Sequence, residues 1–278
     1  MNVLSIQSDV VYGHVGNAAA RFALQRLGHE VWAVPTVLLS SHAGYAKVGG
    51  ESLSADLLRR LVDGLDANGW LAGCDAVLSG YLGHADHASV VADAVRRVKA
   101  ANRNALYCLD PVFGDAGRAY AKPGVAEAMA RELLPLADIV TPNVFELSSL
   151  TSVAIRNADD AHVAAKRLGR PLVLVTSVPV AGGRIGTLAV AQDEAWLAST
   201  PLLENPPHGS GDLMAALFLA HRLAKRSPHD ALAATAASVF DILEKSVAAG
   251  SHEMLMIENQ DALVAPPESP ALRIEKIA

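Results

Sequence analysis

The sequence predicts an α/β fold in which a central, mostly parallel sheet carries helices on both faces. Short apolar runs typical of strands buried on both faces alternate along the chain with longer segments whose apolar residues recur at helical spacing. Strand and helix in turn imply right-handed crossovers between parallel neighbours. With 278 residues, 51% of them hydrophobic, the chain can bury a large core, and we expect one domain over residues 1–278.

Each expected strand or helix corresponds to a segment whose apolar residues have the spacing of that element. The expected strands are residues 3–7, 31–37, 76–79, 105–110, 139–141 and 172–175. The expected helices are residues 16–27, 54–68, 84–101, 125–134 and 159–168. Residues 184–190 and 195–199 fit a hairpin at one edge of the sheet, and the proline-rich residues 265–270 indicate a terminal extension.

Composition favours a small-molecule partner over a nucleic acid or a membrane. The net charge is −6 and the basic residues are scattered, so the charge pattern of a nucleic-acid binder is missing. The longest apolar run, residues 213–220, is too short to span a bilayer, and the N-terminus lacks the features of a signal peptide. Cys74 and Cys108 have no metal-ligand spacing. We therefore expect a cytoplasmic protein.

A glycine-containing segment runs directly into a predicted helix near the end of the chain. Residues 205–212 read Asn-Pro-Pro-His-Gly-Ser-Gly-Asp, and the apolar run 213–220 follows. A helix N-terminus offers unpaired N–H groups and a positive dipole end, which favour a bound phosphate. Asp212 beside such a site could accept a proton from a hydroxyl that attacks the phosphate. From this segment alone, a simple dipole-complementing role for Asp212 fits equally well.

Polar side chains come at the ends of the predicted strands. In open parallel sheets the ligand crevice lies outside the carboxyl ends of the strands, so these residues should line one edge. They are Ser8, His42, Tyr45, Tyr81, Asp110, Thr141, Thr176 and Ser177, with residues 209–212 completing the set.

Two acidic residues have both a structural and a functional interpretation. Asn143 followed by Glu146 fits a helix capping box, and this is the favoured interpretation of that tetrapeptide; alternatively Glu146 holds Mg²⁺ directly or through water. Asp110 before Pro111 fits a strand end, but a buried aspartate facing a phosphate crevice also suits a hard cation. Residues 113–120 are an ordinary surface loop or a mobile flap over the phosphates.

Five motifs in order give the chain a resemblance to a known family. The segment 7–17 reads Gln-Ser-Asp-Val-Val-Tyr-Gly-His-Val-Gly-Asn, and Ser-Gly-Tyr-Leu-Gly follows at 79–83. Asp-Pro-Val-Phe-Gly-Asp at 110–115, Thr-Pro-Asn-Val-Phe-Glu at 141–146 and Gly-Ser-Gly-Asp at 209–212 complete the series. Along nearly its whole length the chain resembles the pyridoxal kinases of the ribokinase-like superfamily, and in particular the bacterial Y type.

The resemblance implies a ribokinase-like fold and ATP-dependent transfer of a phosphoryl group to the 5′-hydroxyl of pyridoxal, assisted by Mg²⁺. It implies Asp212 as the catalytic base. The implied substrate-binding residues are Ser8, His42, Tyr45, Tyr81 and Asp212. The implied ATP-binding residues are Asp110, Asp115, Thr141, Glu146, Thr176, Gly209, Ser210 and Gly211, and those for the metal are Asp110 and Glu146. Relatives of this kind are usually homodimers, so we expect a homodimer.

The chain departs from the family pattern at three positions. Ala43 follows His42 where Thr is common among relatives, which removes a side-chain contact to substrate. Ser210 replaces a common Thr or Val but keeps the backbone donors. Thr176 stands where some relatives carry lysine and fits those that use bound K⁺ or Na⁺, a hypothesis for this chain. A hydroxymethylpyrimidine kinase and a non-catalytic carrier of pyridoxal 5′-phosphate remain as alternatives.

Overall fold

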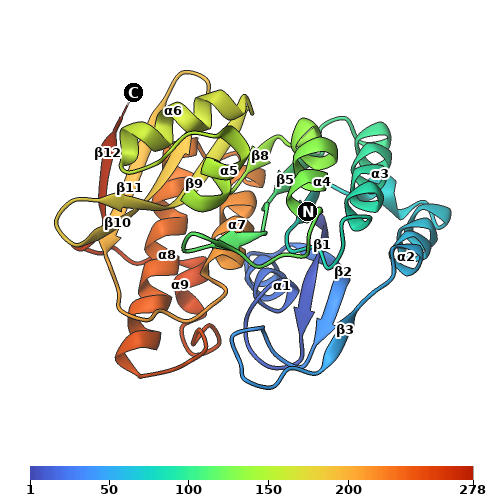
Figure 1. Ribbon diagram of the computed structural model, residues 1–278, viewed down its shortest axis with the longest axis horizontal. Helices are drawn as coiled ribbons and strands as arrows, with labels where there is room; N and C mark the ends of the chain where they lie inside the picture. The colour runs from blue at the N-terminus through green and yellow to red at the C-terminus, as the bar shows by residue number, and fades with distance from the viewer. Residues whose placement is uncertain (278) are drawn as a thin grey trace.

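One ten-stranded sheet runs through the protein in the computed structural model, which describes residues 1–277 (Figure 1). A separate two-stranded ribbon stands beside it. The strands are β1 (Asn2–Val10), β2 (Glu30–Leu39), β3 (Gly50–Ser52), β4 (Ala76–Ser79), β5 (Leu106–Leu109), β6 (Gly114–Asp115), β7 (Arg118–Ala119), β8 (Ile139–Val140), β9 (Leu172–Val180), β10 (Arg184–Val190), β11 (Ala195–Pro201) and β12 (Arg273–Lys276).

The order in the large sheet is β12-β11-β10-β9-β8-β5-β4-β1-β2-β3. Neighbours from β9 to β2 in this order pair in parallel, whereas β10, β11 and β12 at one edge and β3 at the other pair antiparallel. The predicted fold class, a mostly parallel α/β sheet with helices, is confirmed. The predicted hairpin is β10–β11, but β12 covers its outer edge.

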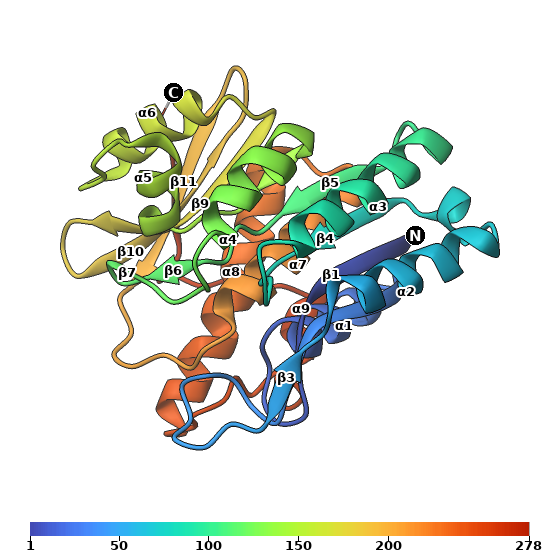
Figure 2. The same cartoon turned by 45° about the vertical axis from the view of Figure 1, so that its right-hand side comes forward.

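Helices cover both faces of the sheet (Figures 1 and 2). One layer holds α1 (Asn17–Arg26), α7 (Ser210–Leu223), α8 (Pro228–Ala248) and α9 (Asp261–Val264). The other holds α2 (Ala55–Ala67), α3 (His87–Ala101), α4 (Val125–Ala128), α5 (Val144–Thr151) and α6 (Ala158–Leu168). Short 3₁₀ or π turns occupy Trp70–Gly73, Met129–Leu133 and Leu134–Leu136. Within residues 1–277, no helix is both long and apolar enough to cross a bilayer.

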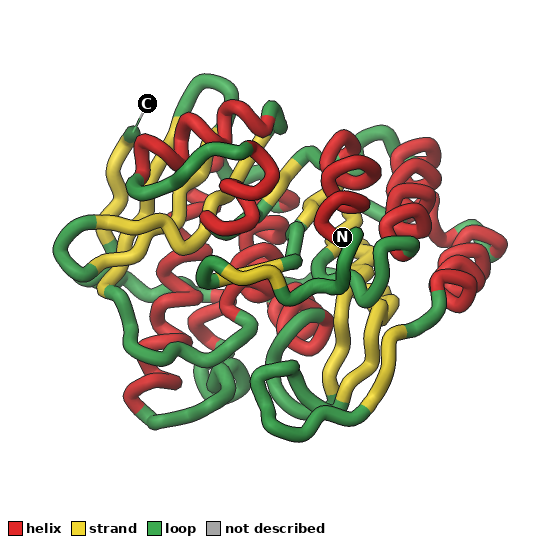
Figure 3. The backbone as a smooth tube through the Cα atoms, in the orientation of Figure 1, coloured by secondary structure: helices red, strands yellow, loops and turns green. Residues whose placement is uncertain are grey.

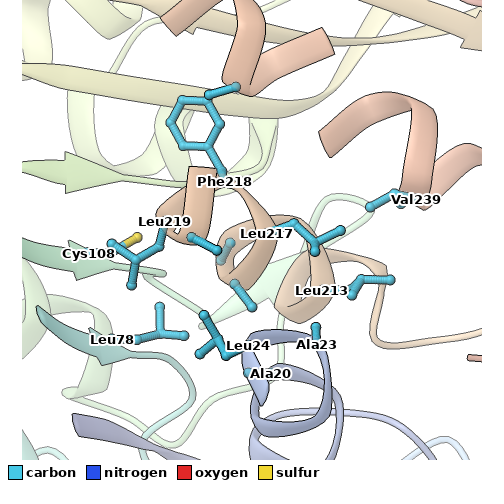
Figure 4. Packing of buried hydrophobic residues seen from close by; sticks show 14 of the residues in the cluster. Ala20, Ala23, Leu24, Leu78, Cys108, Leu213, Leu217, Phe218, Leu219 and Val239 are labelled. Carbon is cyan, nitrogen blue, oxygen red and sulfur yellow. The ribbon is translucent and has the colours of Figure 1, made fainter. Parts of the chain in front are cut away.

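The helix α7 lies at the centre of one apolar core. It is apolar almost all round, and most of its residues are buried. Figure 4 shows Leu213 and Leu217 of α7 close to Ala23 of α1, while Leu78 of β4 and Cys108 of β5 come from the sheet. Because α7 packs tightly on both α1 and α8, its N-terminus is held firmly at the edge of the sheet.

Two of the strands are longer than predicted, and this changes the position of two site residues. Ser8 was expected after the first strand and Thr176 after the sixth, but both lie inside strands, in β1 and β9. The pairing of β1 with β2 shifts register between Gln7 and Asp9, and that of β10 with β9 shifts opposite Thr176 and Ser177. Register shifts of this kind re-aim side chains, and they are common beside active sites.

Several elements were not predicted from the sequence. The short strands β3, β6 and β7 carry no periodic pattern, and β12 follows a proline-rich segment and is largely polar. The predicted helix 125–134 is one turn of α-helix followed by a π turn and a 3₁₀ turn, which Pro135 enters. The loops after β2 and before α7 lie in the lower half of Figure 3.

A buried hydroxyl pair joins two central strands and gives a test of the packing. Ser79 of β4 and Tyr107 of β5 are both fully buried, and their oxygens lie 2.7 Å apart. Tyr107→Phe leaves the Ser79 hydroxyl without this partner, so we expect the free energy of unfolding to fall by about 1–3 kcal/mol. Urea unfolding without ligand measures it.

The double variant Ser79→Ala/Tyr107→Phe is the matched control. Because both polar groups are removed together, no hydroxyl stays buried and unpaired, and the double variant should be at least as stable as Tyr107→Phe. A double variant less stable than Tyr107→Phe would contradict this account of the pair.

Candidate active site

A cavity of about 470 Å³ opens at the carboxyl ends of the central strands. It extends from the end of β5 to the N-terminus of α7 and is bounded on its far side by β10, β11 and α8. All the residues predicted for ATP and the metal line it: Asp110, Asp115, Thr141, Glu146, Thr176, Gly209, Ser210 and Gly211, together with Asp212.

The segment before α7 has the geometry that an anion site requires. Gly209 is the N-cap of α7, with φ 95° in the left-handed region. A side chain there would be strained, and its Cβ would lie 2.0 Å from the carbonyl oxygen of His14, so the turn requires glycine. The first N–H groups of α7 have no partner inside the helix and face the cavity end. The arrangement can bind a phosphate group.

Asp212 lies in the first turn of α7 and lines the cavity. Burial raises the pKa of Asp212 to about 6, although N–H groups of Gly16 and of its own backbone hydrogen-bond to the carboxylate and lower it. A carboxylate with this pKa is ionised at neutral pH and is a stronger base than an ordinary aspartate. It is therefore suited to accepting a proton beside the anion site.

Asp110 follows β5 and is 5% exposed. Its Oδ1 accepts a hydrogen bond of 2.8 Å from the Thr141 hydroxyl, which follows the neighbouring strand β8. Burial, with the charge of Asp212, raises the pKa of Asp110 to about 8, and the Thr141 hydroxyl opposes the shift. Such a buried carboxylate favours a bound cation, whose charge would offset the burial.

Glu146 forms the capping box that the sequence favoured. Its Oε2 accepts from the backbone N–H of Asn143 at 2.9 Å, and the Asn143 side chain accepts from the Glu146 N–H at the same distance. The other oxygen, Oε1, accepts from the N–H of Phe113 at 3.1 Å. Burial, with the charge of Asp110, raises the pKa of Glu146. Glu146 therefore joins the helix cap to the start of residues 113–120.

The donor set is compatible with Mg²⁺ bound mainly by phosphates. Among residues 1–277, no three His, Cys, Asp or Glu side chains are grouped to hold a metal ion by themselves. Mg²⁺ usually takes one or two carboxylates and completes its shell with water and substrate phosphates. Asp110 supplies a buried carboxylate, and Glu146, with both oxygens already accepting hydrogen bonds, is placed for contact through water.

Residues 113–120, interpreted as either a surface loop or a flap, contain the ribbon β6–β7. Asp115 is exposed and accepts from the Ala116 N–H, while Tyr120 stacks on Tyr81 with ring centroids 6.5 Å apart. Both Asp115 and Tyr120 line the cavity. Residues 113–120 therefore join the cavity to Tyr81.

Of the residues predicted for the acceptor substrate, Asp212 lines the cavity, whereas the other four lie beside it. Ser8 contacts Gly16, whose N–H bonds Asp212. Tyr45 and His42 follow β2, with ring centroids 4.7 Å apart. Tyr81 is half-buried, and its carbonyl oxygen accepts from the Thr36 hydroxyl. The structure groups Ser8 with Asp212 and Tyr45 with His42.

Several contributing residues were missed at the sequence level. His208 lines the cavity, and its ring centroid lies 4.6 Å from that of His42. This contact joins the cavity to the loop that follows β2. Ser5, Gln7 and Asn17 form a buried hydrogen-bonded network under the segment 7–17. Glu253 accepts from the Tyr45 hydroxyl.

Comparison with known proteins agrees with this site. A family model described as phosphomethylpyrimidine kinase matches residues 63–256, a range that contains every residue of the cavity lining. The fold, the site and this match thus define the class of the protein as a kinase related to the phosphomethylpyrimidine kinases. The model does not include residues 1–62, where Ser8, His42 and Tyr45 lie.

Longer matches identify the family within that class. Pyridoxal kinase PdxY from Rubrobacter xylanophilus is 48% identical over 275 residues, covering 96% of this chain and 95% of that protein. The same enzyme from Corynebacterium diphtheriae is 45% identical over 273 residues, with 96% of each chain covered. A solved pyridoxal kinase from Leishmania donovani, in complex with ADP and pyridoxamine, is 31% identical with a TM-score of 0.93, covering 100% of this chain and 99% of that one. The chain belongs to the pyridoxal kinase family.

The raised pKa of Asp110 predicts how the stability of the metal-free protein depends on pH. The folded state holds a proton on Asp110 up to about pH 8, whereas an unfolded aspartate loses it near pH 4. Between these values the folded state binds more protons, so the free energy of unfolding falls as pH rises. With a chelator present, we expect a fall on the order of 1 kcal/mol per pH unit between pH 6.5 and 8, measured by urea unfolding.

Asp110→Asn should flatten this slope, because asparagine does not titrate. Asp193→Asn is the control, since Asp193 is exposed and removal of its charge should leave the slope of the original protein unchanged. An equal slope in Asp110→Asn and the original protein would contradict the assignment of the shift to Asp110.

Proposed function

We propose that the chain catalyses ATP-dependent phosphorylation of the 5′-hydroxyl of pyridoxal, giving pyridoxal 5′-phosphate. The observation that carries the proposal is Asp212 in the first turn of α7, beside the free N–H groups of that helix. Family membership supports the choice of acceptor, because the matches that name pyridoxal kinases cover 96% of the chain and so include most of the first 62 residues, which the phosphomethylpyrimidine kinase model does not.

In the proposed reaction, the oxygen of the 5′-hydroxyl of pyridoxal attacks the γ-phosphorus of ATP, and Asp212 accepts the proton of that hydroxyl. The bond from the γ-phosphorus to the β-phosphate oxygen breaks, and ADP leaves. The backbone N–H groups of Gly209, Ser210 and Gly211 hydrogen-bond the transferring phosphoryl group and stabilise its charge. The pKa of Asp212, about 6, keeps this base ionised at neutral pH.

The nucleotide side is assigned to the residues that line the cavity. Thr141 and Thr176 offer hydroxyls to the phosphates or to a monovalent cation, and Asp115 belongs to the flap that shields them. Mg²⁺ would be held by Asp110 and, through water, by Glu146, and when bound it neutralises charge on the phosphates. The raised pKa values of Asp110 and Glu146 support a cation here, since hydrogen bonds to the two carboxylates oppose the effect of burial without cancelling it.

The acceptor side is assigned to Ser8, His42, Tyr45 and Tyr81. Ser8, aimed by the register shift in β1, would hydrogen-bond the polar edge of the pyridine ring. The rings of Tyr45 and Tyr81 offer apolar walls for a flat aromatic substrate. His42 stands between Tyr45 and His208, at the boundary with the nucleotide side.

The proposal extends to the whole chain as a single ribokinase-like kinase domain that forms a homodimer in the cytoplasm. Leu38 and Val48 are 48% and 40% exposed beside the edge strand β3, and exposed apolar residues at an unpaired edge favour association. Size-exclusion chromatography with light scattering measures the oligomeric state.

Asp212→Asn tests the assigned base. We expect the rate of pyridoxal 5′-phosphate formation, followed by absorbance with ATP, Mg²⁺ and K⁺, to fall by at least about 10²-fold, because asparagine cannot accept the proton. The dissociation constant for pyridoxal should change little, because the side chain keeps its shape. Turnover equal to that of the original protein would remove Asp212 from this role.

Two controls accompany the assay. Asp193→Asn removes an exposed carboxylate and should retain full turnover. Hydroxymethylpyrimidine, offered as the acceptor in place of pyridoxal, should react much more slowly; faster turnover with it would favour the alternative kinase. Binding of pyridoxal with no transfer by the original protein would favour the carrier.

Thr176 supports a requirement for K⁺ or Na⁺. It lies at the register shift in β9, lines the cavity and precedes Ser177, whose φ of 60° is left-handed. We expect turnover to fall severalfold when tetramethylammonium replaces K⁺ and Na⁺, because no alkali ion then offsets the phosphate charge. Thr176→Lys places an ammonium group there and should remove the dependence. Equal activity of the original protein in both buffers would overturn the hypothesis.

A further inference from the structure

Glu253 is a buried carboxylate outside the cavity lining. It lies between α8 and α9 and is 8% exposed. A buried carboxylate is stable only when its oxygens accept hydrogen bonds or pair with a cation. Here both oxygens are used, and their partners belong to two loops that lie far away in the sequence: residues 11–16, between β1 and α1, and residues 40–49, between β2 and β3.

One oxygen of Glu253 holds the 11–16 loop. Oε2 accepts a hydrogen bond of 3.0 Å from the backbone N–H of His14. The carboxylate lies directly against Gly13, where an added Cβ would be 2.5 Å from Oε2. Gly13 also has a φ of 98°, so this close approach of backbone and carboxylate requires glycine.

The other oxygen holds the 40–49 loop. Oε1 accepts from the Tyr45 hydroxyl at 2.7 Å and lies 3.2 Å from Nε2 of His42. Nδ1 of His42 accepts from the N–H of Gly44 at 3.1 Å, so in the neutral ring the proton is on Nε2, toward Glu253. Burial and His208 lower the pKa of His42, and Glu253 opposes this shift.

The 11–16 loop in turn contacts the groups assigned to the reaction. The N–H of Gly16 bonds the carboxylate of Asp212, and Gly16 also contacts Ser8. The carbonyl of His14 packs against Gly209, and Met254, next to Glu253 in the chain, contacts the same glycine. A single carboxylate thus joins the substrate wall at Tyr45 to the loop that contacts Ser8 and Asp212.

We propose that Glu253 is a positioning residue for the acceptor substrate. It touches no reacting atom; it fixes the 11–16 and 40–49 loops relative to each other, and so sets the place of the Tyr45 ring relative to the loop that contacts Ser8. The inference rests on the proposed function for the identity of the acceptor. Because Glu253 bonds neither α5 nor the 113–120 segment, it should matter for pyridoxal much more than for ATP.

Equilibrium binding of Glu253→Gln tests the inference. Glutamine keeps the volume of the side chain but has one accepting oxygen, so one of the two loops loses its partner. We expect the dissociation constant for pyridoxal, measured by titration calorimetry without nucleotide, to rise about tenfold, as loss of a hydrogen bond to a charged group implies. The constant for ATP with Mg²⁺ should stay within about twofold. Glu258→Gln, an exposed neighbour in sequence, should change neither.

Tyr45→Phe provides a second measurement that does not depend on the folding of Glu253→Gln. It removes the hydroxyl that bonds Glu253 and keeps the ring, and Tyr45 is half-buried, so the fold should tolerate it. We expect a smaller rise in the pyridoxal constant, about threefold, and none for ATP. An unchanged pyridoxal constant in both variants, or equal rises for pyridoxal and ATP, would overturn the positioning role.

These binding measurements separate the two proposals. If the original protein binds pyridoxal but does not phosphorylate it, the proposed function fails, while weaker pyridoxal binding by Glu253→Gln still supports the positioning role. If the original protein phosphorylates pyridoxal and Glu253→Gln binds it equally well, only the positioning role fails. An original protein that binds no pyridoxal overturns both.

Discussion

Carboxylates gathered at one buried cavity are the constraint on which the site depends. Asp110 and Glu146 are almost fully buried, and Asp212 lines the same cavity. Burial, with the charge of a neighbouring carboxylate, raises the pKa of Asp110 and of Glu146. In residues 1–277, no lysine or arginine contributes to these shifts. Burial makes the ionised forms of these carboxylates unfavourable in the empty fold, and a cation with its phosphates offsets that cost. The free N–H groups of α7 supply the complementary positive potential.

The sheet determines how these charges come together. Asp110 follows β5 and Thr141 follows the adjacent β8, and parallel pairing puts both strand ends at one edge, where the Thr141 hydroxyl reaches Asp110. Two register shifts then expose polar side chains inside strands, Ser8 in β1 and Thr176 in β9. The core packing of α7 against α1 and the sheet fixes the remaining component, the anion site at its N-terminus.

The sequence predicted many of the residues that line the cavity because these residues are encoded locally. Asp110, Thr141, Asn143 and Glu146 fall at strand ends or helix starts, where short motifs reveal both the element and its polar residue. The positions of Ser8 and Thr176 inside strands were not predictable, since register shifts arise from pairing between distant segments. For the same reason β12, which is largely polar and is held only by β11, gave no signal.

The proposed acceptor half is built instead from contacts across the whole chain. Glu253 bonds His14, 239 positions away, and Tyr45, 208 positions away, so no local motif could reveal it. This division matches the comparisons: the phosphomethylpyrimidine kinase model, named for a different acceptor, includes the cavity residues and Glu253 but not residues 1–62. Under the proposed function, one phosphate and metal site serves different acceptors when the 11–16 and 40–49 loops change, provided that the segment around residue 253 still holds those loops against the N-terminus of α7.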